Sequence, residues 1–520
     1  MKLNESSFFI KYKRQLIFGI IMMLAAVVRF VLFSNHPGGL NQDEASIGYE
    51  AWAIMNYGID RNGMSMPVHL LAWGSGQNTL YAYFSMPFIK LFGLNVFSMR
   101  IVNLLFSLLS IPAIYGIMRR ASNAKTALIA CAVLAISPWN IMLSRWGLES
   151  NLFPSLFIIA VYFFVLSLKS KWFLVVSAFI FALTLYSYGA AYLVVTLFCF
   201  VCFLFIIAKR LVPLKVCFIS LGVFLLISLP IYLFVIINAF DLNQISIGML
   251  TIPKMHSSRM SLLTDGITMQ SVFKNIFHLF ILQDDGIPLF DQNNVSANVI
   301  PIFGCFYAIS MPFLIYGVII SIKHRSEHDF IALAALASSF ALLIIYSSAN
   351  TNRVNVLYIT MIYFIARGIS AVIKNHSSFI AITCTYAIFF TCFCSVYFGQ
   401  EYREKIADRF YVSFGDALEK ADEIAQEDDT IYITSYANMP YIYVLFYNKV
   451  PPADFHNTAV YENYGAFESV TSFDRYIIGA HAPTEDAVFV IANHELDYYD
   501  TTYRDVYTFE NYSVIAPYEN

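Results

Sequence analysis

The chain has 520 residues, of which 58% are hydrophobic and 13% are charged, whereas soluble proteins carry about 25% charged residues. This composition, with 48 Phe and 34 Tyr, excludes a disordered chain, a collagen-like chain and a basic nucleic-acid-binding protein, and it predicts a polytopic α-helical membrane protein. The net charge of −3 combines two unlike parts. Residues 1–401 carry 25 Lys and Arg against 14 Asp and Glu, and residues 402–520 carry 7 against 21, so we expect a membrane domain followed by an acidic soluble domain.

Eleven apolar runs are long enough to be membrane spans, since a spanning helix needs about 20 apolar residues. The first run follows basic residues and has no signal-peptide cleavage pattern, so we expect it to be retained. Basic residues cluster on alternate connections, which places the N-terminus in the cytoplasm by the positive-inside rule and the C-terminal domain outside. The expected spans lie near residues 15–33, 98–118, 125–143, 150–168, 172–187, 190–208, 215–238, 300–322, 329–347, 354–372 and 378–397.

Two long connections, residues 34–97 and 239–299, fall on the outer side of this topology. Loops of this length in a compact protein are usually functional. The first is expected to contain two short helices, Asp43–Tyr57 and Leu80–Phe92, each followed by the glycine that favours a helix C-terminus. Both are too short to span a bilayer, so we expect them to lie at its surface.

The region from residue 402 onwards has the pattern of a small α/β domain. The eight cysteines all fall in apolar runs before it, so neither a disulfide framework nor a zinc site is expected. Helices are expected near 412–427 and 438–448, and strands at 430–434, 475–479 and 487–492.

Carboxylates are absent from the middle of every expected span, which argues against an ion-coupled transporter. Asp43 and Glu44 instead follow the first span at the start of an outer helix, and Glu149 lies in a polar hinge between the third and fourth spans. A simple alternative is that acids in a first turn complement the helix dipole, for about 0.3–1 kcal/mol. As catalytic candidates, Asp43, Glu44 and Glu149 would divide base and orienting roles, and Asp43 and Glu149 would be the ligands of a shared divalent metal.

Four arginines lie at the outer ends of spans, against the positive-inside bias, and are candidates for binding a lipid-linked phosphate. Arginine suits this role because its planar guanidinium binds phosphate oxygens in a bidentate manner. The alternative for each is that it reaches a headgroup or pairs with a nearby acid. These residues are Arg29, Arg100, Arg145 and Arg353, and Lys254 and Arg259 in the second outer loop would extend the anion site.

Aromatic and amide side chains also gather on the outer side, where a sugar face would stack on rings and sugar hydroxyls would bind amides. For the tyrosines the competing explanation is the aromatic belt found at any membrane interface. The candidates for sugar or acceptor binding are Trp73, Gln77, Asn78, Tyr81 and Tyr188.

Four segments together resemble the GT-C superfamily of membrane glycosyltransferases, close to the protein O-mannosyltransferases and the lipid A aminoarabinose transferase. They are Asp43-Glu44-Ala-x-x-Gly48-Tyr-Glu-Ala-Trp52, Trp73-Gly-Ser-Gly-Gln-Asn78, Ser144-Arg-Trp-Gly-Leu-Glu-Ser-Asn151 and Asn352-Arg-Val-Asn355. The resemblance covers about residues 10–400, so residues 1–401 are expected to form a GT-C-like catalytic domain and 402–520 an extracytoplasmic α/β domain.

The resemblance implies an inverting transfer of a sugar from a polyprenyl-phosphate carrier to an acceptor on the outer face of the membrane. Asp43 matches the family's catalytic carboxylate, and Arg145 and Arg353 are the preferred phosphate ligands. Some relatives use a divalent metal, but this chain has Glu149 where some have Asp, and it lacks an adjacent His. The C-terminal region does not resemble the sugar-binding domain of the eukaryotic O-mannosyltransferases, so protein O-mannosylation is not implied.

With no disulfide framework, the chain fits a bacterial plasma membrane, where the carrier would be undecaprenyl phosphate and the acceptor a cell-envelope glycan, lipid or protein. Two other functions stay open. A lipid-linked glycan transporter or flippase would use the arginines without breaking a bond, and a non-catalytic GT-C scaffold would assist another enzyme.

Overall fold

The structure is a computed structural model that describes residues 3–74, 76–257, 266–287, 296–463, 467–479 and 487–518, with side chains from residue 12 onwards. Two compact units make up the chain. Unit 1 comprises Met1–Phe33, Asn103–Leu229 and Met260–Tyr402, and unit 2 comprises Ser34–Val102, Pro230–Arg259 and Arg403–Asn520. Much of the two long outer loops therefore clusters with the C-terminal region rather than with the helices that flank those loops.

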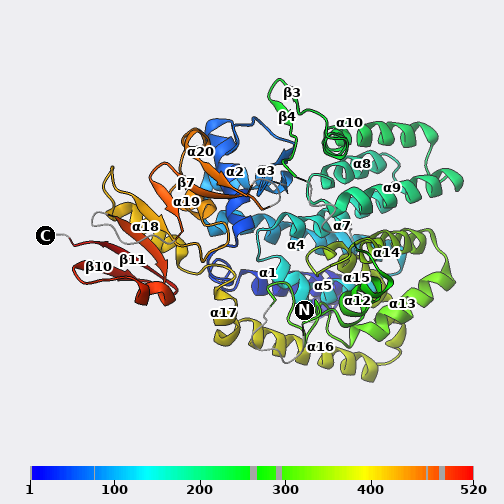
Figure 1. Cartoon of the computed structure of the whole chain (residues 1–520). Helices are drawn as coiled ribbons and strands as arrows, with labels where there is room; N and C mark the ends of the chain where they lie inside the picture. Colours follow the sequence, from blue (N-terminus) through cyan, green and yellow to red (C-terminus); the bar gives the residue numbers. More distant parts are fainter. Residues whose placement is uncertain are drawn as a thin grey trace. The chain divides into compact units, whose positions relative to one another are not determined.

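Unit 1 is a helical bundle, and most of its helices are apolar along their whole length (Figure 1). Among the described residues, seven helices are long and apolar enough to cross a membrane, and three further apolar helices are shorter. The seven are α4 (Val96–Ala121), α7 (Glu149–Ser167), α9 (Ala190–Ala208), α10 (Leu214–Ala239), α14 (Glu327–Ile345), α15 (Asn355–Val372) and α16 (His376–Tyr397). The shorter helices are α5 (Ala124–Ile136), α8 (Phe173–Thr184) and α13 (Ser310–His324), and α1 (Leu3–Phe30), α6 (Pro138–Leu143), α12 (Met269–Asn275) and the π-helix η1 (Ile276–Leu282) complete the bundle.

The prediction of a polytopic helical membrane protein is confirmed, and each of the eleven predicted spans overlaps a helix of this bundle. Two predicted boundaries were wrong. The run 125–143 divides at Ser137, because Pro138 starts a new helix for which the Ser137 side chain is the N-cap. The run 300–322 is helical only from Ser310, since turns precede it and Gly304 has a left-handed φ of 58°.

Two glycines let α13 and α15 cross with their backbones in contact. A Cβ atom added at Gly317 would lie 1.9 Å from the carbonyl oxygen of Phe364, and one added at Gly368 would lie 2.0 Å from that of Phe313. No larger residue fits either position without separating the helices. Small residues at a helix crossing are the usual means of close packing in membranes, where burial in lipid supplies no hydrophobic drive for association.

Unit 2 contains the short helices of the first outer loop and the whole C-terminal sheet. The loop elements are α2 (Gln42–Tyr57), α3 (Leu80–Phe92) and the hairpin β1 (His69–Leu70) with β2 (Gln77–Asn78), and a second hairpin pairs β3 (Ile245–Ile247) with β4 (Leu250–Ile252). Both helices were predicted within one residue, because Gly58 and Gly93 end them with φ of 76° and 79°.

The C-terminal region forms a mixed seven-stranded sheet with strand order β10-β11-β9-β5-β8-β7-β6. The three strands predicted from sequence are its centre, where β5 pairs in parallel with both β8 and β9. The four outer strands and the short helices α17 and α20 were missed. The bounds are β5 (Ile431–Ile433), β6 (Val460–Glu462), β7 (Ser469–Phe473), β8 (Tyr476–Ile478), β9 (Val488–Ala492), β10 (Arg504–Thr508), β11 (Tyr512–Pro517), α17 (Gln400–Ala407), α18 (Phe414–Ile424), α19 (Tyr441–Tyr447), α20 (Pro452–Thr458) and the 3₁₀-helix η2 (Asn493–Tyr498).

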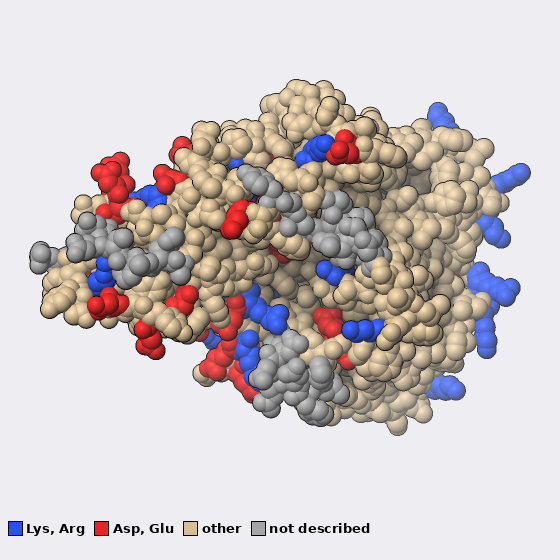
Figure 2. Space-filling model, viewed as in Figure 1, with Lys and Arg blue, Asp and Glu red and all other residues tan. Residues whose placement is uncertain are grey.

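Charge is unevenly spread over the visible face. Figure 2 shows Lys and Arg side chains along the margin where helices of unit 1 end, next to a broad uncharged surface. In unit 2, Asp and Glu side chains are scattered over the region of the C-terminal sheet.

Candidate functional site

Asp43 lies in the first turn of α2, where the backbone around it is fixed by a capping box. The side chain of Asn41 accepts a hydrogen bond from the Asp43 N–H at 3.0 Å, and the Glu44 carboxylate accepts one from the Asn41 N–H at 3.1 Å. These bonds satisfy two N–H groups that a helix start otherwise leaves unpaired. The Asp43 carboxylate itself is only half-buried, so it is the acid of this motif that is oriented yet accessible.

Gln77 holds the Asp43 carboxylate from the β1–β2 hairpin. Its Nε2 donates a hydrogen bond to Asp43 Oδ1 at 3.1 Å, and the side chain of Gln77 is buried. The structure thus brings together two residues that the sequence assigned separately, one to catalysis and one to substrate binding.

Glu44 and Arg100 pair with each other, which is the alternative that the sequence left open for Arg100. Arg100 Nε and Nη2 lie 2.9 and 3.0 Å from the two carboxylate oxygens of Glu44, and both side chains are fully buried. The remaining donors of Arg100 bind the carbonyls of Pro37 and Gly39 at 2.6 and 2.8 Å. In this arrangement Glu44 closes a helix cap and Arg100 is its counter-ion, so neither is presented to a substrate.

Arg29 and Arg145, in unit 1, also bind protein carbonyls rather than face an open site. Arg29 Nη1 and Nη2 donate to the carbonyls of Ala135 and Leu134 at the end of α5, at 3.0 and 3.2 Å. Arg145 donates to the carbonyls of Arg29 and Leu32 at the end of α1, at 2.8 and 2.7 Å. The last carbonyls of a helix have no partner within it and carry partial negative charge, so they are the anionic groups that retain these two arginines.

The other predicted anion ligands are more exposed. Arg353 is half-buried, donates to the carbonyl of Ser348 and remains a phosphate candidate. Lys254 lies 2.8 Å from the exposed carboxylate of Asp241, and Arg259 lies outside the described residues. Glu149 is the half-buried first residue of α7 in unit 1, where it also complements the helix dipole.

The aromatic candidates have different environments. Trp73 is buried, and its ring meets that of Tyr441 edge to face at 5.9 Å. Tyr81 is fully buried, and its hydroxyl donates to the Met99 carbonyl at 2.6 Å, so it is a core residue of unit 2. Tyr188 is half-buried between α8 and α9 in unit 1, and Asn78 is buried on β2.

A buried charge cluster joins Glu50 of α2 to Asp60 and Arg61, which follow the end of α2, and the sequence did not predict it. Arg61 Nε lies 2.9 Å from Glu50 Oε1, and its Nη2 donates to Ser46 Oγ at 2.9 Å. Burial raises the pKa of Glu50 and of Asp60, although the Arg61 charge opposes the rise. Helical spacing was the available signal, since Glu50 follows Asp43 by two turns and lies on the same face of α2.

No group of three or more His, Cys, Asp or Glu side chains gathers as a metal site within the part of the chain that the structure describes. The two carboxylates named as metal ligands, Asp43 and Glu149, belong to different units. Their carboxylates suit a hard divalent cation, but two single carboxylates are a sparse donor set.

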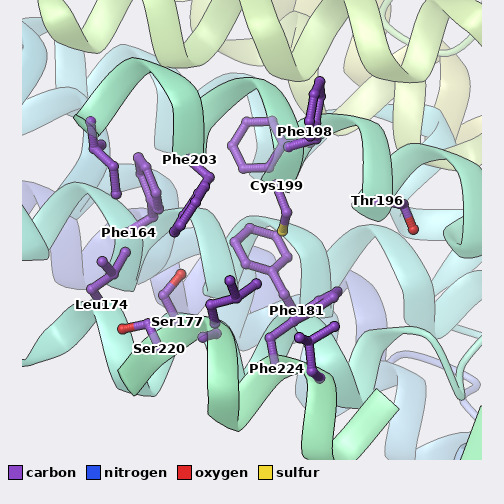
Figure 3. Close-up of a pocket in the computed structure, with 15 residues that line it drawn as sticks. Phe164, Leu174, Ser177, Phe181, Thr196, Phe198, Cys199, Phe203, Ser220 and Phe224 are labelled. Carbon is purple, nitrogen blue, oxygen red and sulfur yellow. The ribbon is translucent and has the colours of Figure 1, made fainter. Parts of the chain in front are cut away.

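An apolar cavity of about 200 Å³ lies among α7, α8, α9 and α10 in unit 1 (Figure 3). Its hydroxyl groups donate to backbone carbonyls of the surrounding helices. Ser220 donates to the Val216 carbonyl and Thr196 to that of Tyr192, each within its own helix, and Ser177 of α8 donates to the Ala160 carbonyl of α7. The cavity therefore presents hydrocarbon and aromatic surface, without the polar groups that bind a phosphate or a sugar.

The sequence matches one family model over part of its length. The family described as dolichyl-phosphate-mannose-protein mannosyltransferase matches residues 78–234. No protein of curated function matches the sequence.

Solved structures match over much more of the chain. ArnT from Cupriavidus metallidurans in the apo state has a TM-score of 0.55 at 13% identity, covering 96% of this chain and 97% of that one. ArnT bound to undecaprenyl phosphate gives 0.56 at 12% identity, with the same coverage. The apo oligosaccharyltransferase of Archaeoglobus fulgidus has a TM-score of 0.52 at 14% identity over 86% of this chain, which spans only 64% of the archaeal protein.

At these identities the likeness is one of fold, and it extends over nearly the whole of ArnT. Of the two motifs in the first outer loop, the one that begins at Asp43 lies on α2 of unit 2, and the one that ends at Asn78 runs into the β1–β2 hairpin of the same unit. The chain therefore has the GT-C fold, which it shares with ArnT and with the archaeal oligosaccharyltransferase.

Proposed function

We propose that this protein is a glycosyltransferase that moves a hexose from undecaprenyl phosphate to an acceptor hydroxyl at the outer face of a bacterial plasma membrane, with Asp43 as the catalytic base. The observation that carries the proposal is that Asp43 is half-buried, that the capping box of α2 holds its backbone and that Gln77 donates a hydrogen bond to its carboxylate. The GT-C fold and the undecaprenyl phosphate bound by ArnT support a lipid-linked donor.

The proposed reaction is a single inverting displacement. The acceptor oxygen attacks the anomeric carbon, its proton passes to Asp43, and the bond from the anomeric carbon to the phosphate oxygen breaks to release undecaprenyl phosphate. Because phosphate is a good leaving group, the site mainly has to position the acceptor and stabilise negative charge on phosphate. Arg353 is the preferred phosphate ligand, since Arg29, Arg100 and Arg145 bind groups of the protein.

No step of the proposed reaction depends on a divalent metal. The N-terminus is proposed to be cytoplasmic and the C-terminal α/β domain extracytoplasmic. Residues 1–401 would carry the reaction, and the C-terminal domain would contribute to acceptor binding.

The test measures release of undecaprenyl phosphate from a panel of undecaprenyl-phosphate hexoses by purified protein in lipid, with water as a slow acceptor. Asp43→Asn should lower the rate by about 10²- to 10⁴-fold, the usual contribution of a general base, while binding of undecaprenyl phosphate persists. Asp454→Asn, which changes an exposed acid of α20, is the matched control and should retain full activity.

Two results would contradict the proposal. If Asp43→Asn releases carrier at the wild-type rate, Asp43 is a helix-end charge and not a base. If wild-type protein binds the donors, releases nothing and instead moves them intact across the bilayer, the chain is a flippase.

A further inference from the structure

Only one of the two polar atoms in the side-chain amide of Gln77 has a hydrogen-bond partner among the described residues. Nε2 donates to Asp43 Oδ1, but Oε1 is buried and accepts no hydrogen bond from any residue that the structure describes. Only 4% of the Gln77 surface is exposed. Buried polar atoms in native proteins are almost always paired, so an unused acceptor next to a candidate catalytic acid indicates a missing partner.

The assignment of the two amide atoms follows from chemistry. A carboxylate only accepts hydrogen bonds, so an ionised Asp43 requires the NH₂ group of Gln77 to face it. The carbonyl oxygen of Gln77 must then point away from Asp43, and only a donor can satisfy it.

The hairpin that carries Gln77 is locked in place. Its backbone pairs Leu70 with Gln77, and a Cβ atom at Gly76 would lie 2.4 Å from the His69 ring and 2.6 Å from the Leu70 carbonyl oxygen. The His69 ring stacks on Phe234 with centroids 4.2 Å apart. Burial lowers the pKa of His69 to about 4, so the ring is neutral at physiological pH. The backbone of the hairpin that carries Gln77 is therefore closely packed.

We propose that Gln77 positions the Asp43 carboxylate and, through Oε1, accepts a hydrogen bond from a second hydroxyl of the acceptor. One amide then links the base to its substrate: the reacting hydroxyl binds Asp43, and a neighbouring hydroxyl binds Gln77. Two hydroxyls on adjacent carbons are what a sugar ring offers, whereas a Ser or Thr side chain offers one. The inference rests on the proposed function and narrows its acceptor to a glycan.

Two substitutions test the positioning role. Gln77→Leu removes both interactions at similar size and should lower kcat for carrier release by about 10- to 100-fold, the loss expected for a hydrogen bond to a charged group. Gln77→Glu places a second carboxylate beside Asp43 and should shift the acidic limb of the pH–rate profile to higher pH by about one unit or more, because two nearby carboxylates disfavour joint ionisation. Thr79→Val is the matched control: it removes the bond from Thr79 Oγ1 to the Val68 carbonyl in the same hairpin and should leave the limb in place.

Simple alcohols test the acceptor role. Wild-type protein supplied with an undecaprenyl-phosphate hexose should glycosylate ethylene glycol at least about fivefold faster than ethanol, since only the diol has a second hydroxyl for Gln77. Gln77→Leu should abolish this preference, and Thr79→Val should keep it.

The outcomes separate this inference from the proposed function. The role of Gln77 alone would be overturned by the following pair of results. Asp43→Asn loses carrier release, but the Gln77 variants keep the wild-type kcat, the acidic limb of the pH–rate profile and the preference for the diol. A wild-type protein that releases carrier but shows no preference for the diol, or makes neither alcohol product, would overturn the acceptor assignment. Activity in Asp43→Asn would overturn the proposed function itself.

Discussion

Replacing Arg100 by Met is expected to destabilise unit 2 much more than replacing Arg100 by Met and Glu44 by Leu together. The single change leaves the Glu44 charge in a site with no exposed surface and removes two charged hydrogen bonds of 2.9 and 3.0 Å. Breaking a buried ion pair from one side costs about 3–5 kcal/mol. The double change removes both charges and leaves the carbonyls of Pro37 and Gly39 without their donor, at about 1 kcal/mol each.

The apparent Tm of the purified protein in detergent measures this difference. For a unit of about 200 residues, each kcal/mol shifts Tm by about 2–4 °C. Arg100→Met should therefore lower Tm by about 6–20 °C, and the double variant should recover at least half of that loss. Glu44→Leu alone completes the double-mutant cycle.

Two results would refute the reasoning. Additive shifts in the cycle would mean that the two side chains do not interact in the folded protein. A Glu44→Leu variant with unchanged Tm but no carrier release would mean that Glu44 acts in catalysis rather than in the helix cap.

Three further outcomes are expected. Arg145→Met should lower Tm, because carbonyls at the end of α1 lose the guanidinium that donates hydrogen bonds to them. The affinity of this variant for undecaprenyl phosphate should stay unchanged. Weaker binding of undecaprenyl phosphate at unchanged Tm would instead show that Arg145 binds the phosphate. Gly368→Val should lower Tm by the equivalent of about 3 kcal/mol or more, because α13 and α15 must separate, whereas Gly222→Ala, which meets no atom within 4 Å, should not. Burial raises the pKa of Glu50, so the folded form holds a proton that the unfolded chain has lost, and Tm should fall as pH rises above the ordinary value of 4.5. In Glu50→Gln this part of the pH dependence should vanish, and an unchanged Tm profile would show that Glu50 is ionised when folded.

Hydropathy was sufficient to predict the spanning helices. It could not predict the hydrogen-bond partners of the arginines near their ends. A run of about 20 apolar residues has few alternatives to a spanning helix, because backbone groups in lipid must bond within the segment. By contrast, Arg29, Arg100 and Arg145 were all expected to face a phosphate. Their partners are carbonyls or a carboxylate more than 50 residues away in the chain, and no local pattern reveals such pairs.

Strand prediction succeeded for the three central strands, whereas β11 was missed although it is buried at five of its six positions. The runs that became β5, β8 and β9 are rich in Ile, Val, Phe and Tyr, and β9 is buried at every position. Strands β6 and β10 at the edges of the sheet are partly exposed and mix charged with apolar residues, so their sequences resemble loops. They are strands because neighbouring strands supply hydrogen bonds to them.

For the candidate site, the sequence by itself determined that an acid-bearing helix, Asp43–Tyr57, starts just after the first span and ends at Gly58, since caps and turns depend on residues within four positions of each other. Only the tertiary structure decided that Glu44 is neutralised by Arg100 and that Gln77 binds Asp43 across 34 residues of chain. Whether a buried polar group is a structural partner or a free ligand depends on which distant segments pack against it, and that information is absent from local sequence.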